Sequence, residues 1–176
     1  MPARAFHSLF ENLFDRGLQP DSAFADALAQ AGYRASQPLA VYPAEVWKAC
    51  LEVAWKHRFP TQSADEAYRQ LGRETTEGYF RSALGPIFTE IIPLLPMHAF
   101  FGQLESYTRV GRSDVKLEFQ ELLSDRFRIR TLDPLGVNQW FFVGALEGVL
   151  ERKSLKSEWN VEGPPTDYLV SCRWWR

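Results

Sequence analysis

The chain has 176 residues, the length of one ordinary domain, and its 45% hydrophobic and 24% charged residues exclude an intrinsically disordered protein. Its net charge of −2 attracts neither nucleic acid nor anionic lipid, and no apolar segment is long enough for a secretion signal or a membrane span. We therefore expect a single cytoplasmic domain over residues 1–176, with no nucleic-acid or membrane partner.

The first third of the chain has helical spacing. Apolar residues predict a short helix from about residue 6, which Gly17 should end. A second helix is expected over 23–31, and the segment 33–42 is expected to be an extended connector. Pro43 suits the first turn of a third helix, whose apolar residues cover more than half of its circumference. That helix should be central to the core.

The middle of the chain continues in helices. Ser63 and Glu66 have the spacing of a capping box that opens a long helix. Three glycines interrupt this region, and we interpret them as points of close backbone packing: Gly72, Gly78 and Gly85. The apolar run 86–96 contains three prolines and predicts a short buried helix. Residues 97–109 predict one further helix with an aromatic inner side.

The last third changes to an alternating pattern. Residues 115–131 alternate apolar and charged side chains, which predicts a hairpin with one solvated face carrying cross-strand ion pairs. Residues 137–152 return to helical spacing, and the segments 155–161 and 168–174 predict a second hairpin. Helices followed by strand-strand-helix-strand-strand indicate an α+β fold, in which the helical N-terminal two thirds pack with an antiparallel sheet.

No catalytic constellation is recognisable. The chain lacks a nucleophile elbow, a Walker loop and a dinucleotide fingerprint, so we expect no enzyme. The three histidines are scattered: His7, His57 and His98. Gly144 and Gly148 recur at the small-residue spacing that lets a helix lie close to a sheet. Cys50 and Cys172 lie in apolar patterns and should be reduced core residues.

The chain resembles a myxobacterial paralogous family known only as a domain of unknown function. The resemblance lies in Tyr42-Pro43-Ala44-Glu45-Val46-Trp47, in Glu66-Ala67-Tyr68-Arg69-Gln70-Leu71-Gly72-Arg73, in Glu77-Gly78-Tyr79 and in Gly85. The tail, from Trp140 to Trp175, is similar to the closing helix and hairpin of a broader group of haem nitric-oxide-binding domains, trafficking subunits and vinyl-reductase-type ligand-binding domains. This likeness implies helices and a curved sheet that enclose a pocket, or else a dimer surface.

The chain departs from those relatives where they bind a cofactor. Haem-binding members have a proximal histidine and a Tyr-x-Ser-x-Arg motif, which Tyr107-Thr108-Arg109 does not match. Zinc-holding members use several cysteines near the C-terminus, where Cys172 stands alone. We therefore expect neither haem nor zinc, and no other cofactor.

Six aromatic side chains from three predicted helices suggest a binding site: Trp47, Trp55, Phe100, Phe101, Phe141 and Phe142. Arg109, in a basic loop, is a candidate for gripping an anionic group of a ligand. The leading hypothesis is a non-enzymatic small-molecule-binding or sensory module with an apolar aromatic pocket that signals through a protein partner. The alternative is a homodimeric interaction or adaptor module with a filled core. Trp174 and Trp175 must face opposite ways, so one of them needs a cover outside the core.

Overall fold

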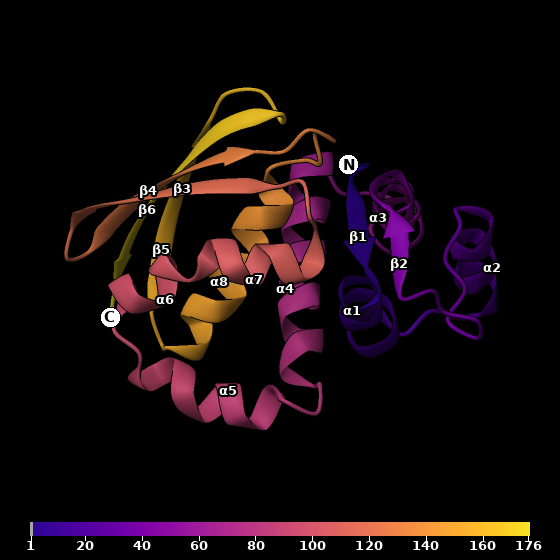
Figure 1. The fold of residues 1–176 in the computed structure, drawn as a ribbon, viewed down its shortest axis with the longest axis horizontal. Coiled ribbons are helices and arrows are strands. Elements are labelled where there is room, and N and C mark those ends of the chain that lie inside the picture. Colours follow the sequence, from indigo (N-terminus) through magenta and orange to yellow (C-terminus); the bar gives the residue numbers. More distant parts are fainter. Residues whose placement is uncertain (1) are drawn as a thin grey trace.

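The computed structural model describes residues 2–176 (Figure 1). An N-terminal group of helices is closed by a two-stranded antiparallel ladder of β1 and β2, in which Ala5 pairs with Tyr42. The elements of this group are β1 (Arg4–Phe6), α1 (His7–Phe10), the π-helix η1 (Glu11–Leu18), α2 (Ser22–Gln30), β2 (Val41–Pro43) and α3 (Ala44–Arg58). The ladder was not predicted from the sequence, because strands of three residues are too short to show alternation.

The first helix differs from its prediction in form and in its end. It begins as α1, continues as a π-helix and ends only at Leu18, after which Gln19 has a left-handed φ of 50°. Gly17 therefore does not end it. A Cβ at Gly17 would lie 2.7 Å from the carbonyl oxygen of Glu74, so this glycine allows η1 to approach α4 (Ala64–Phe80) closely.

Helix α4 (Ala64–Phe80) stands between the N-terminal group and α8 (Trp140–Arg152) (Figure 1). The capping box of Ser63 and Glu66 is confirmed. Gly72 faces the backbone of Phe141 and Ala145, and a Cβ at that position would lie 2.7 Å from the Ala145 nitrogen. The predicted close packing at this glycine is therefore confirmed.

The prediction for Gly144 and Gly148 was wrong about the partner. Both glycines pack against α4 and not against the sheet, with Gly144 facing the Arg69 carbonyl and Gly148 facing the Thr76 side chain. Arg69 also forms an ion pair with the buried Glu147 across the same contact. The spacing of small residues indicates a close approach, but it does not say which element approaches.

The C-terminal sheet has the strand order β3-β4-β6-β5 and is antiparallel throughout. Its strands are β3 (Lys116–Leu123), β4 (Arg126–Leu132), β5 (Lys156–Glu162) and β6 (Asp167–Trp175). One face is buried and the other is solvated, as the alternation predicted. On the solvated face Arg130 pairs with Glu118 at 3.9 Å and with Asp167 at 2.9 Å. The α+β fold class and the cross-strand ion pairs are confirmed.

The segment between α4 and the sheet corrects two predictions. It forms α5 (Gly85–Ile91), η2 (Ile92–Leu94), α6 (Met97–Gly102) and α7 (Leu104–Gly111). The helix expected over 97–109 is thus divided at Gln103. The helix expected to be buried is mostly exposed, since Ile87 is 53% and Leu94 is 81% accessible while Ile92 is buried.

Polar contacts help to anchor the exposed segment. The Nζ of Lys153 donates hydrogen bonds to the carbonyls of Ile92, at 2.5 Å, and Leu95, at 2.8 Å. The prolines divide the run into short helical pieces, and short pieces present little continuous apolar face to bury.

Both cysteines are free and buried, as predicted. Trp174 is buried and Trp175 is 42% exposed, so the alternation of β6 places them on opposite faces. No helix within residues 2–176 is both long enough and apolar enough to span a membrane.

Candidate functional site

A cavity of about 380 Å³ lies between α4, α7, α8, the buried face of the sheet and the N-terminal group. Its walls are mostly apolar. Helix α8 contributes the longest wall, and η1 and α3 reach the cavity through Asn12 and Trp47. The segment 91–95 closes another side through Ile91, Ile92 and Leu95. The volume falls in the range of ligand pockets, which is about 300–1,000 Å³.

Four of the six predicted aromatic residues border this cavity: Trp47, Phe100, Phe141 and Phe142. Phe141 meets Trp47 edge to face, with ring centroids 5.7 Å apart. Trp47 also packs against Phe10 at 5.1 Å, so the wall of the cavity is continuous with the N-terminal core. The structure thus brings residues from all three of the predicted helices together around one cavity.

The other three predicted site residues lie elsewhere. Trp55 is on another face of α3, where its indole nitrogen donates to the carbonyl of Gln62 at 3.3 Å. Phe101 lies in the sheet core, with its ring centroid 3.9 Å from that of Phe127. Arg109 is exposed and pairs with Glu105 one helical turn away, at 2.7 Å. Adjacent residues of a helix point about 100° apart, and this separates Phe100 from Phe101.

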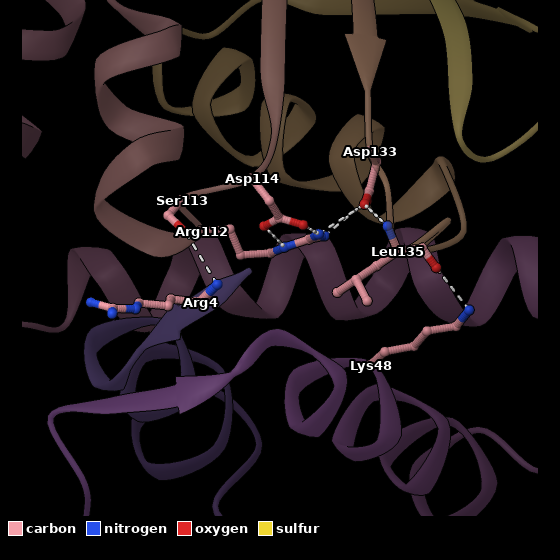
Figure 2. Close-up of polar contacts among 7 residues, drawn as sticks. All are labelled: Arg4, Lys48, Arg112, Ser113, Asp114, Asp133 and Leu135. Carbon is pink, nitrogen blue, oxygen red and sulfur yellow. Dashed lines mark hydrogen bonds and ion pairs between the residues drawn. The ribbon is translucent and has the colours of Figure 1, made fainter. Parts of the chain in front are cut away.

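Arg112, and not Arg109, lies in the wall of the cavity at its polar end. Figure 2 shows the contacts of its guanidinium with Asp114 and Asp133. Its guanidinium donates to both oxygens of Asp133, at 2.9 and 2.8 Å, and to both oxygens of Asp114, at 3.1 and 2.6 Å. Burial works against the charge of Arg112, but the two carboxylates outweigh burial and hold its pKa above the ordinary value. Arg112, Asp114 and Asp133 thus form a buried ion cluster in which the guanidinium binds each carboxylate through two hydrogen bonds.

The same cluster lies where the N-terminal group meets the sheet. Arg112 forms a bridge with Ala5 of β1, and the Ser113 amide donates to the Arg4 carbonyl at 3.0 Å. Nearby, the Nζ of Lys48 on α3 donates to the Leu135 carbonyl at 2.8 Å (Figure 2). Arg112 follows Gly111 shortly after Arg109, but the sequence carries no signal for its partner Asp133, which lies 21 positions further along the chain.

One polar atom beside the cavity has no partner. The Oγ1 of Thr131 is buried and makes no hydrogen bond that meets normal distance and angle limits, although it lies near enough to the Tyr168 phenol to oppose the rise of that group's pKa. The neighbouring residue in the sheet register is Tyr168, whose pKa is raised above its ordinary value mainly by burial. Both residues border the cavity. The polar end of the cavity therefore contains a paired arginine, a neutral phenol and an unsatisfied hydroxyl.

The arrangement of helices and sheet is that of the H-NOX domains. A Fe(II) unliganded H-NOX protein from K. algicida has a TM-score of 0.67 and 11% identity, over 96% of this chain and 95% of that one. An Fe(II)NO H-NOX protein from S. oneidensis has a TM-score of 0.72 and 10% identity, over 97% and 99%. An oxygen-binding H-NOX domain related to soluble guanylate cyclases has a TM-score of 0.64 and 12% identity, over 96% of this chain and 92% of that one. These likenesses establish the fold.

The chain belongs to the family described as "Protein of unknown function (DUF2378)", whose model matches residues 3–169. Both parts of the predicted resemblance, to a family of unknown function and to haem nitric-oxide-binding domains, are thereby confirmed. No curated protein matches the sequence significantly.

The residues of the cavity do not fit haem. None of the described side chains that border it is a histidine, cysteine or methionine, and His98 is exposed outside it. Tyr168 would have to ionise to bind iron, which its raised pKa opposes. Arg112, which could have met a propionate, is already engaged by two carboxylates. Residues 2–176 also contain no described group of three or more metal-ligating side chains.

Proposed function

We propose that this protein is a non-enzymatic binding module that takes a small, mostly apolar molecule into the cavity and passes on its occupancy to a protein partner. The observation that supports the proposal is the cavity itself, about 380 Å³ in volume and bordered by aromatic rings from α3, α6 and α8. An apolar molecule gains free energy by leaving water for such walls, at roughly 25 cal/mol per Å² of buried apolar surface.

The cavity favours this function over a filled-core adaptor. In an adaptor without a ligand, Trp47, Phe141 and Phe142 would interlock and leave no space of ligand size. Most polar groups of the site are engaged in hydrogen bonds within the protein, which favours binding over catalysis. Arg112 is held by Asp133, and Thr76 donates to the Ala145 carbonyl at 2.9 Å. No described nucleophile in the cavity wall stands beside a base.

The segment of α5 and η2 is the part of the wall that we propose to contact a partner. On its inner side Ile92 and Leu95 border the cavity. On its outer side Ile87 and Leu94 are exposed. A molecule in the cavity would touch the inner side chains, so the position of the outer ones would depend on occupancy. The proposed partner would therefore bind an apolar surface next to the ligand.

The binding function is tested with the fluorescent apolar probe N-phenyl-1-naphthylamine. We expect saturable fluorescence enhancement with one site per chain in the wild type. Ala145→Leu places an isobutyl group in the cavity wall and should weaken binding at least about tenfold. Ala25→Leu makes the same change on an exposed face of α2 and serves as the matched control. Equal binding by the wild type and a folded Ala145→Leu variant would overturn the proposed site.

The relay to a partner is tested by hydrogen exchange with and without the same probe. We expect amide exchange in 85–95 to slow when the probe binds, because the inner side chains of this segment touch it. Helix α2 has no residue in the cavity wall and should exchange at an unchanged rate. Unchanged exchange in 85–95 under saturating probe would refute the role of this segment.

A further inference from the structure

The polar end of the cavity selects the chemical class of the ligand. Building on the proposed binding function, we infer that the ligand is an uncharged apolar molecule with one hydroxyl or comparable hydrogen-bonding group, which lies against Thr131, and that anions of the same size are rejected. Three features of this end of the cavity carry the inference: the charge balance of the ion cluster, the unsatisfied hydroxyl, and the apolar walls.

The charge balance disfavours an anionic ligand. Arg112 and Asp133 are the only charged residues among the described residues of the wall. Asp114 joins the same guanidinium from behind, so the cluster holds one positive and two negative groups. Its hydrogen bonds already use Nε, Nη1 and both N–H groups of Nη2. A carboxylate or phosphate would therefore meet a net negative charge in a low-dielectric site, where like charges repel strongly.

The hydroxyl of Thr131 supplies the place for a neutral polar group. A threonine hydroxyl has one proton to donate and two lone pairs to accept, and buried polar atoms in proteins are normally hydrogen-bonded. Thr131 Oγ1 makes no bond of normal hydrogen-bond geometry, although it lies close to the Tyr168 phenol. The other threonines of the wall differ, because Thr75 and Thr108 donate to carbonyls of their own helices, at 2.9 and 2.8 Å. A ligand hydroxyl at this point would satisfy Thr131.

The walls also disfavour a cationic ligand. Apart from the polar end, most of the cavity wall consists of apolar side chains such as Leu104, Leu146 and Val149, which offer an ammonium group no hydrogen bonds. The carboxylates of Asp114 and Asp133 are already committed to Arg112. An ammonium would have to give up its water without gaining a free counter-charge, which is costly in an apolar site.

The test uses displacement of N-phenyl-1-naphthylamine by ligands of equal chain length: decane, 1-decanol, decylamine and decanoate. In the wild type we expect 1-decanol to bind more tightly than decanoate or decylamine. Thr131→Val keeps the shape and removes the hydroxyl, so it should weaken 1-decanol by about five- to tenfold and leave decane and the probe within about twofold. Asp114→Asn should tighten decanoate by at least about fivefold and leave 1-decanol unchanged.

The outcomes separate the two proposals. If neither the probe nor any of the four ligands binds, the proposed function itself is wrong. If the probe binds but decanoate or decylamine displaces it as well as 1-decanol does, the inferred ligand class is wrong and the cavity is still a binding site. The inferred contact is likewise wrong if Thr131→Val weakens the binding of decane and of 1-decanol equally, or if it weakens the binding of neither ligand. Thermal melts of both variants establish that each is folded.

Discussion

The close contact between α4 and α8 makes Gly72→Ala the sharpest test of the fold around the cavity. A methyl group at this position would lie 2.7 Å from the Ala145 nitrogen and 3.0 Å from the Phe141 carbonyl carbon, and closer still to the Phe141 oxygen. These atoms are backbone, so they cannot turn aside as a flexible side chain could. Helix α8 would have to move away from α4, and it carries the longest wall of the cavity with it.

Two effects of opposite sign set the magnitude. Alanine is favoured over glycine inside a helix by about 1 kcal/mol. Overpacking a close contact costs about 1–3 kcal/mol and more where backbone must shift, and the reciprocal contact of Gly144 with the Arg69 carbonyl is then also strained. Because backbone atoms must shift here, we put the cost of overpacking at about 3–4 kcal/mol and expect a net loss of about 2–3 kcal/mol. For a chain of this size that loss lowers Tm by about 4–12 °C.

Thermal unfolding followed by circular dichroism measures this loss. Gly102→Ala is the matched control, because a Cβ there has no heavy atom within 4 Å and the residue is the last of α6. That variant should melt at or slightly above the wild-type temperature, by up to about 1 kcal/mol of added stability. If Gly72→Ala also melts at or above the wild-type temperature, α4 and α8 are not as close as described.

Three further outcomes are expected. Burial raises the pKa of Cys50 to about 12 and also raises that of Cys172. A thiol assay near pH 8 should therefore find no reactive thiol in the native protein and two after denaturation, and fast reaction of the native protein would contradict this. Burial raises the pKa of Asp15 despite a hydrogen bond from Tyr33, so the folded state holds its proton more firmly and stability falls as pH rises through that pKa. Asp15→Asn should therefore be at least as stable as the wild type at neutral pH, with the difference shrinking toward pH 4, and a less stable variant in denaturant titrations would oppose this account. Trp47→Ala should cost about 3–5 kcal/mol in the same titrations, and an unchanged midpoint would refute the central place of α3.

The elements with a strong period were predictable from the sequence. Residues 115–131 alternate strictly, and a strand whose one face is buried and whose other face is wet must show this alternation. The capping box at Ser63 was equally predictable, because all its partners lie within one helical turn. Both signals are local, so one sequence is enough to find them.

The exposed segment after α4 was not predictable in the same way. The run 86–96 is apolar, and an apolar run is most often buried, yet Leu94 is 81% exposed. Burial depends on whether another element covers the segment, and here hydrogen bonds from Lys153 hold it at the edge of the fold. That contact joins residues about sixty positions apart, and no local sequence pattern near either residue predicts it. We propose that a partner protein provides the missing cover.

The cavity is a second feature that the sequence predicts only in part. Spacing along a helix predicts which residues face inward, and it placed Trp47, Phe100 and Phe141 around one space. It does not predict how far apart the facing helices stand, which depends on contacts such as that of Gly72 with the α8 backbone. The same rings would fill the interior if the helices stood closer together. Whether an apolar molecule fits this space therefore depends on the distances between elements, and we expect any substitution that changes those distances to change binding and stability together.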